Sequence, residues 1–250
     1  MTANEHQPMA ARRPALDRAT AMHLAETEYQ RFLAMLQQLA PEGWRRPTDC
    51  DGWDVRAVAG HCLGMAEMAA SLRQMLHQMS AAKRRGGVPI DALTAVQVEE
   101  RADLTPDQVT ARFARVGPKA ARSRRRTPGF VRRREMPDRQ PVGDTTEAWT
   151  FGYLVDVILT RDPWMHRADI ARATGTVMEL TPDHDGVLVA DVVQEWAERQ
   201  TTPAALELTG PAGGSWPGTG EPAVVDAIDF CRALSGRGGV VATRGVHVPF

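Results

Sequence analysis

VDVILTRDPWMHRADIARATG, residues 155–175, is the stretch that most constrains the fold. Its apolar residues recur at steps of three and four, which predicts the end of a long helix from Thr145 to about Thr174. Gly175 is the expected C-terminal cap of this helix. Asp162 and His166 stand four residues apart, so they share one helix face, and that face continues an apolar row. Two potential metal ligands therefore point toward the interior of the fold.

A second helix carries one more inward histidine. The segment from about Asp54 to Met79 has helical periodicity, and Asp54 or Asp51 is available as its N-terminal cap. His61 begins a row at steps of three and four whose other members are all apolar: Met65, Met68, Leu72, Met75 and Met79. This row predicts that His61 points inward. A lone inward histidine is more often a core residue than a ligand, so a role for His61 depends on what faces it.

Two imidazoles and one carboxylate, from His61, His166 and Asp162, form a ligand set suited to Zn²⁺ or another divalent first-row metal. Three protein ligands leave one position open for water or substrate. The competing interpretation is that Asp162 caps a helix that restarts at Pro163. An interior proline destabilises a helix by about 3 kcal/mol, so we expect a break or kink here. A carboxylate used for capping would be partly diverted from a metal.

The remaining periodicity predicts an α-rich chain of two domains. Two further helices are expected, one at residues 16–39 and one formed by the stretches 91–102 and 106–122, which is interrupted near Thr105 and Pro106, with Thr105 as N-cap and Pro106 at the first helical position. Four helices in the first 175 residues favour a bundle that builds sites between facing helices. Beyond them, helices at 183–198 and 223–234 alternate with β-prone runs at 205–209 and 240–241, around a loop at 210–222. We therefore expect a bundle over residues 1–178 and a small α/β domain over residues 179–250.

A basic run extends from Lys119 to Arg134, where eight of sixteen residues are basic and none is acidic. The interval from Arg124 to Asp144 is rich in proline, glycine and arginine, which predicts a loop. Such a loop would attract nucleic acid. However, Phe130 is its only aromatic residue for base stacking, and no helix-turn-helix or zinc-finger spacing accompanies it. A solvated loop is the favoured interpretation, and nucleic acid is not an expected partner.

Composition and charge restrict the partners and the cellular location that we expect for the protein. The 250 residues include 30 basic and 31 acidic ones, a formal net charge of -1, so no whole-molecule field attracts nucleic acid or membrane. The cysteines Cys50, Cys62 and Cys231 form no disulfide or metal motif, which fits a reducing cytoplasm. No apolar run approaches the roughly 20 residues needed to cross a bilayer, and the first twenty residues lack a secretory signal. We expect a cytoplasmic protein without a membrane partner.

Three segments, in this order and spacing, resemble one known family. The first spans residues 44–61 and contains PTDCDGWD at 47–54, the second is RDPWMHRADI at 161–170 followed by Gly175, and the third is FCRALSGR at 230–237. Together they resemble the mycothiol-dependent maleylpyruvate isomerase family within the DinB-like superfamily. The resemblance covers nearly the whole chain.

This resemblance implies a DinB-like four-helix bundle with a histidine, acidic residue, histidine metal triad, usually zinc. A C-terminal α/β domain resembling sterol-carrier modules is implied as well. His61 and His166 match the two histidine positions, and Asp162 stands where the family commonly has the longer glutamate. Family members use mycothiol, the low-molecular-weight thiol of actinobacteria. The resemblance therefore implies a transferase or isomerase in which a metal-bound thiolate attacks a small electrophile.

Two arginines are candidates for binding an anionic substrate. Arg237, in the turn after the last helix, is the first and Arg167, beside His166, the second, because guanidinium binds anions in a fixed geometry. The alternative for Arg237 is that it caps a helix C-terminus. Cys62 is interpreted as an inert buried thiol.

A non-enzymatic protein of the same fold, binding a small molecule or serving a regulatory role, is the alternative to an enzyme. It is favoured by the aspartate at position 162 and by Pro163. The physiological electrophile, the residues that would hold mycothiol and the oligomeric state have no signature in the sequence.

Overall fold

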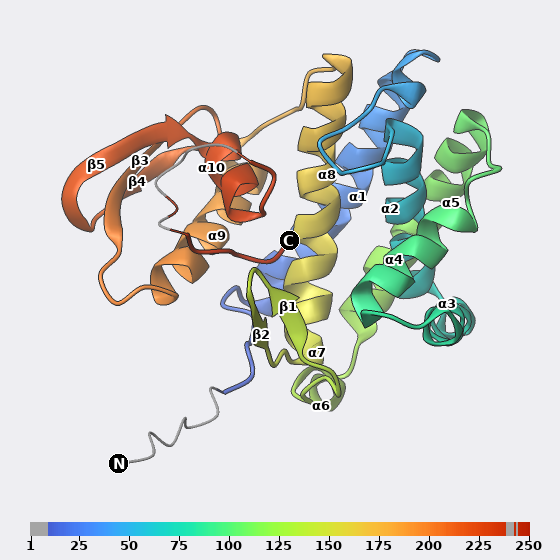
Figure 1. The fold of residues 1–250 in the computed structure, drawn as a ribbon, viewed down its shortest axis with the longest axis horizontal. Coiled ribbons are helices and arrows are strands. Elements are labelled where there is room, and N and C mark those ends of the chain that lie inside the picture. The colour runs from blue at the N-terminus through green and yellow to red at the C-terminus, as the bar shows by residue number, and fades with distance from the viewer. Residues whose placement is uncertain (1–9, 239–242, 244) are drawn as a thin grey trace.

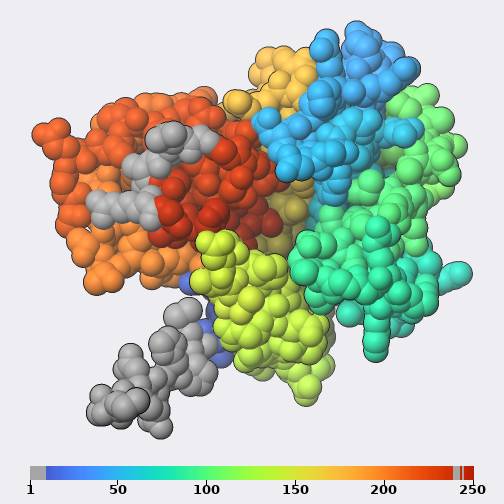
Figure 2. All heavy atoms as spheres, in the orientation of Figure 1, coloured from blue at the N-terminus to red at the C-terminus, as the bar shows by residue number. Residues whose placement is uncertain are grey.

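The structure, a computed structural model, describes residues 10–238, 243 and 245–250. Its elements form two adjoining groups, with most of the helices in one and a small sheet with two helices in the other (Figure 1). Figure 2 shows the two groups as lobes that meet along one side, with the yellow-green segment of the chain at their lower edge. The expectation of an α-rich chain with a small C-terminal sheet is thus confirmed.

Four helices of the first group pack in a closed ring: α1 (Arg18–Gln38) and α2 (Val55–Ala70) each pack against both α5 (Pro106–Arg126) and α8 (Leu159–Thr174). Capping side chains start two of them where the sequence predicts, at Asp54 for α2 and at Thr105 for α5. The ring encloses a buried apolar cluster that includes Phe32, Val58, Leu63, Val109 and Phe113.

The prediction of one helix from about Asp54 to Met79 is wrong beyond Ala70, where α2 ends. Ser71 leaves the helical conformation (φ -147°, ψ 118°) and caps a separate helix, α3 (Leu72–Arg85). The row that begins at His61 therefore does not continue into one core. Leu72 and Met79 are 67% and 54% exposed, while His61 is buried. A further helix, α4 (Pro89–Glu99), packs against α2 and α3.

The predicted loop over Arg124–Asp144 contains regular structure. Helix α5 continues to Arg126 and is followed by α6 (Gly129–Arg132) and an antiparallel hairpin of β1 (Gln140–Val142) and β2 (Thr145–Glu147). The helix predicted from Thr145 therefore starts later. It consists of α7 (Phe151–Tyr153), a π-helical turn (Leu154–Ile158) and α8, which ends at Gly175 as expected.

The C-terminal group surrounds a three-stranded sheet in which the central β3 (Ala204–Thr209) runs antiparallel to β4 (Gly214–Trp216) and parallel to β5 (Thr219–Asp226). The predicted loop at 210–222 thus contains strand residues, and the last helix starts at Ala227, after its cap Asp226. The β-prone residues 240–241 lie outside the described residues. The other elements are the 3₁₀ turn Gly43–Arg45, the π turn Pro182–Gly186, α9 (Val187–Glu198) and α10 (Ala227–Leu234).

Helix α8 belongs to both groups. One face lines the helical ring, and the other contributes Trp164, Met165 and Ala168 to a core shared with α9 and α10, including Trp196 and Phe230. A helix that is buried on both faces holds its polar side chains in fixed positions. Among the residues described, no helix has both the length and the apolar character to cross a bilayer.

Candidate functional site

His61, Asp162 and His166 converge between α2 and α8. His61 Nε2 lies 3.2 Å from Asp162 Oδ2, and His166 Nε2 lies 3.7 Å from Asp162 Oδ1. The two imidazole rings stand edge to face with centroids 5.3 Å apart. One potential ligand atom from each of the three side chains lies within 4.8 Å of the others. The structure thus brings together the three residues that the sequence selected.

Asp169 determines which nitrogen of His166 faces this centre. Its Oδ2 lies 2.9 Å from His166 Nδ1, and the carboxylate is fully buried. Burial alone would raise the pKa of Asp169, but hydrogen bonds and charge from His166 and Arg237 hold the pKa below its ordinary value. An ionised Asp169 accepts a hydrogen bond from Nδ1, so Nε2 is the nitrogen that faces Asp162.

Two arginines of the C-terminal group complete the surroundings of Asp169. Arg237 Nε lies 3.0 and 2.9 Å from its two carboxylate oxygens, and Arg232 Nη1 lies 3.1 Å from Oδ1. Arg237 also reaches the imidazole, since its Nη2 is 3.5 Å from His166 Nδ1. The structure therefore places Arg237 at the edge of the site, with Nε bound to Asp169.

Asp162 is the most accessible of the three, with 18% of its side chain exposed. Burial raises its pKa, but the two facing imidazoles outweigh that effect and hold the pKa well below its ordinary value. His61 presents Nε2 to this carboxylate, while its buried Nδ1 has no hydrogen-bond partner within the described residues. The Trp53 ring covers both imidazoles, with centroids 5.3 Å from His61 and 6.2 Å from His166.

The helix that presents Asp162 runs through Pro163, so the expected restart of a helix at this proline is wrong. Asp162 does not cap a restarting helix, and α8 runs from Leu159 through the proline. Pro163 has no N–H for the carbonyl of Leu159, four residues earlier. Arg124 Nη1 donates to that carbonyl at 2.9 Å, and Arg124 Nε donates to the carbonyl of Val155 in the preceding π turn at 2.8 Å. A buried guanidinium thus replaces the missing backbone donor.

We expect Arg124→Ala to lower the free energy of unfolding by about 2–4 kcal/mol, because the buried carbonyl of Leu159 and the partly buried carbonyl of Val155 lose their donor. Arg126→Ala, at the exposed last residue of α5, should change it by less than about 0.5 kcal/mol. Denaturant unfolding of both variants measures the difference. Equal stability of the two would show that Arg124 does not support the helix. The prediction that the basic run is a solvated loop is wrong at Arg124, which is buried and lies in α5.

Arg167 lies away from the converging side chains. Its buried guanidinium donates to both oxygens of Glu28 at 2.7 and 2.9 Å and to Asp185 at 3.0 Å. A third acceptor is the carbonyl of Glu179, at 3.1 Å. These contacts fasten α8 to α1 and to the Pro182–Gly186 turn. Arg167 therefore has a structural role, and the substrate-binding role expected for it is not supported.

Cys50 is a neighbour of the site that the sequence did not single out. Its Sγ lies 3.4 Å from Asp169 Oδ2 and 3.9 Å from His166 Nδ1, and these three side chains form a second group able to hold a metal. Burial and the charge of Asp169 raise the pKa of Cys50 to about 11, so its thiol is protonated at neutral pH. Burial likewise raises the pKa of Cys62. Without a bound metal ion, both thiols are therefore protonated at neutral pH.

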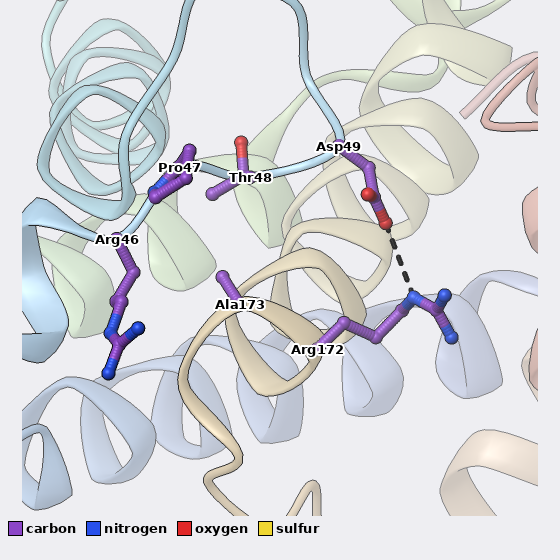
Figure 3. A pocket seen from close by; sticks show the side chains of 6 residues that line it. All are labelled: Arg46, Pro47, Thr48, Asp49, Arg172 and Ala173. Carbon is purple, nitrogen blue, oxygen red and sulfur yellow. Dashed lines mark hydrogen bonds and ion pairs between the residues drawn. The ribbon is translucent and has the colours of Figure 1, made fainter.

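A hollow of about 520 Å³ lies near the C-terminal end of α8, lined by Arg46, Pro47, Thr48, Asp49, Arg172 and Ala173 (Figure 3). Asp49 points at Arg172, with Oδ2 3.2 Å from Nε. The same oxygen accepts from Arg232 at 2.6 Å, and Arg232 also binds Asp169. None of the three converging residues lines this hollow. The converging donor atoms, and not this hollow, therefore define the candidate site.

Comparison with known proteins gives a consistent result. A family model described as the mycothiol maleylpyruvate isomerase N-terminal domain matches residues 25–171. A crystal structure of the mycothiol-dependent maleylpyruvate isomerase is similar with TM-score 0.57 and 15% identity, covering 90% of this chain and 92% of that one. The same isomerase with a histidine-to-alanine substitution has TM-score 0.54 and 15% identity, covering 89% and 90%. No curated protein sequence matches. At this identity the two structures establish the fold alone.

Proposed function

The chain belongs to the family of the mycothiol maleylpyruvate isomerase N-terminal domain, and from that membership we propose a metal-dependent isomerase or S-transferase that uses mycothiol. Its substrate would be a small electrophile such as maleylpyruvate. The observation that carries the proposal is the convergence of His61, Asp162 and His166, whose candidate ligand atoms lie within 4.8 Å of one another.

The donor set fits a divalent ion, and we propose zinc. Two neutral imidazoles and one ionised carboxylate are its usual ligands at an open, catalytic site. Aspartate is shorter than the glutamate common in the family, yet an Asp162 oxygen already lies 3.2 Å from the ring nitrogen of His61. A bound ion would supply one chemical function here, which is to lower the pKa of a coordinated thiol so that it stays ionised at neutral pH.

The chain's own residues would bind and orient the reactants. Asp169 holds His166 in the tautomer that exposes Nε2. We assign substrate binding to Arg237, because its Nε is bound to Asp169, its Nη2 lies beside His166, and its Nη1 makes no hydrogen bond within the described residues and would bind a carboxylate of the substrate. Since the thiols of Cys50 and Cys62 are protonated at neutral pH, the nucleophile would come from the cosubstrate.

We further propose that the ring of α1, α2, α5 and α8 is the DinB-like four-helix bundle, in a domain that extends to residue 178. Residues 179–250 would then form the sterol-carrier-like domain. Contacts such as Arg237 with Asp169 would make this second domain part of the site. A cytoplasmic location is consistent with the three free cysteines.

We expect the zinc-loaded protein to convert maleylpyruvate, or to form an adduct with a model electrophile, only when mycothiol is present. Removing the metal should lower the rate by at least about 100-fold, because a bound ion stabilises the charge that develops in the transition state by several kcal/mol. Asp162→Glu should keep the metal and the activity, while Asp162→Ala should lose both. Enzyme assays with and without mycothiol measure the rates.

The alternative is a non-enzymatic binding protein of the same fold. The aspartate at position 162 favours it, because this residue departs from the family's glutamate. Tight binding of mycothiol to the zinc-loaded protein, with no turnover of maleylpyruvate or of model electrophiles, would establish the alternative and refute the enzyme.

A further inference from the structure

An apolar surface lies on the hairpin of α3 and α4. Among the described residues, eight large apolar side chains are exposed, and five of them come from this hairpin: Leu72, Leu76, Met79, Val88 and Ile90. We call these five the α3–α4 face. Their exposed fractions range from 41% to 67%, so each leaves a large part of its apolar area in water. Such a concentration on one hairpin marks an interaction surface.

Helix α3 buries a polar and a small residue and leaves large apolar side chains exposed. The buried positions on α3 are Gln78 and Ala82. Gln78 donates to the carbonyl of Gly64 at 3.0 Å and accepts from Gln97 at 3.1 Å, so α3 is fixed by amide hydrogen bonds and not by its leucines. Leu72, Leu76 and Met79 are left on the outer part of the helix. These hydrogen bonds prevent the helix from rotating its leucines inward without breaking a buried polar network.

Basic residues lie on the same helix as three of the apolar side chains, while Asp91, next to Ile90, is the acidic residue in the first turn of α4. Helix α3 contains no acidic residue, and its basic residues are Arg73, Lys83, Arg84 and Arg85. Arg85 is paired with Glu99, and Arg84 donates to Ser80. Arg73 and Lys83 have no ion-pair partner within the part of the chain that the structure describes. The partner of this surface must therefore accept aliphatic side chains and cations together.

A second copy of the chain fits this requirement poorly. A twofold contact through α3 would bring Arg73 and Lys83, which have no ion-pair partner within the described residues, near the same two cations of the other copy. Like charges opposed in this way are unfavourable. The face also contains no aromatic residue, whereas protein interfaces are enriched in them. Neither argument applies to an anionic lipid surface, because it supplies an apolar layer beneath a layer of anionic groups.

We propose that the α3–α4 face docks on an anionic lipid surface. Leu72, Leu76, Met79 and Lys83 follow one another at steps of four, three and four, along about 16 Å of one helix side. Helix α3 would lie in the plane of the interface with these aliphatic side chains in the acyl region, and Arg73 and Lys83 would contact the headgroups. Val88 and Ile90 extend the contact into α4. No spanning helix is needed for docking of this kind.

Co-sedimentation with lipid vesicles tests the proposal on the full chain. We expect binding to vesicles of equal parts phosphatidylglycerol and phosphatidylcholine, and little binding to phosphatidylcholine alone. Replacing Arg73 and Lys83 with glutamine should lower the partition coefficient roughly 25-fold, at about fivefold per charge. The triple variant Leu72→Gln, Leu76→Gln, Met79→Gln should lower it by about tenfold or more. The substituted residues are all exposed, so the variants should fold: Leu72, Arg73, Leu76, Met79 and Lys83.

Two controls match these changes elsewhere on the surface. Val177→Gln with Val224→Gln removes exposed aliphatic side chains, and Arg115→Gln with Lys119→Gln removes two exposed charges of α5. Both double variants should bind vesicles as the parent does. Equal loss in a control and in the α3 variants would overturn the proposal in favour of diffuse attraction. Absence of vesicle binding, or dimerisation that the α3 triple variant abolishes, would overturn it as well.

Discussion

Replacing His166 with alanine is expected to remove the bound metal and to abolish turnover. His166 stands 3.7 Å from Asp162 and close against His61, so it is central to the converging donors. Substitutions in the surroundings of a metal ligand typically weaken metal affinity 10- to 100-fold. Loss of the ligand itself should therefore exceed about 100-fold in affinity and lower kcat by a comparable factor. Metal content after dialysis and mycothiol-dependent turnover measure the two effects.

His23→Ala is the matched control, because His23 is exposed on α1. This variant should retain the parent's metal content and activity. A folded His166→Ala protein that keeps one metal per chain would show that His166 is not a ligand. Its far-ultraviolet circular dichroism should equal the parent's, so that unfolding is not mistaken for loss of a ligand.

Asp169→Asn has the second largest expected effect, because one carboxylate serves four partners. It accepts from Cys50, His166, Arg232 and Arg237, and it is fully buried. An amide in its place removes the charge that compensates two guanidinium groups, which should lower the free energy of unfolding by about 3–5 kcal/mol. Metal affinity should fall by about 10- to 100-fold, because His166 loses the acceptor that fixes its tautomer.

Denaturant unfolding measures the first effect of Asp169→Asn. Competition with a chelator, well below the unfolding temperature, measures the second. Asp229→Asn is the control, since this exposed carboxylate of α10 should contribute less than about 0.5 kcal/mol. An Asp169→Asn protein with the parent's metal affinity would refute the positioning role of Asp169, even if its stability were reduced.

Local patterns account for what the sequence predicted. Gly175, Asp54 and Thr105 end or begin helices through contacts within a few residues, so their roles are visible in the sequence alone. The spacing of Asp162 and His166 likewise fixes their common helix face. Ser71 shows the limit of such patterns, because a serine is compatible with both a helix interior and a cap. Periodicity across it merged two helices that point in different directions.

Distant contacts account for what the sequence could not predict. The continuity of α8 through Pro163 depends on Arg124, 35 residues from the carbonyl of Leu159 to which it donates. Arg167 is next to His166 in the chain, but its guanidinium binds Glu28 of α1, 139 residues away. Asp169 gathers Arg232 and Arg237 from another part of the chain. No spacing rule reveals contacts of this range.

Anomalous diffraction at the zinc absorption edge, from crystals of the zinc-loaded protein, tests the central claim most directly. We predict one ion per chain, bonded to Nε2 of His61, Nε2 of His166 and the carboxylate of Asp162. An ion held instead by Cys50, His166 and Asp169, or no ordered ion at stoichiometric zinc, would contradict the account.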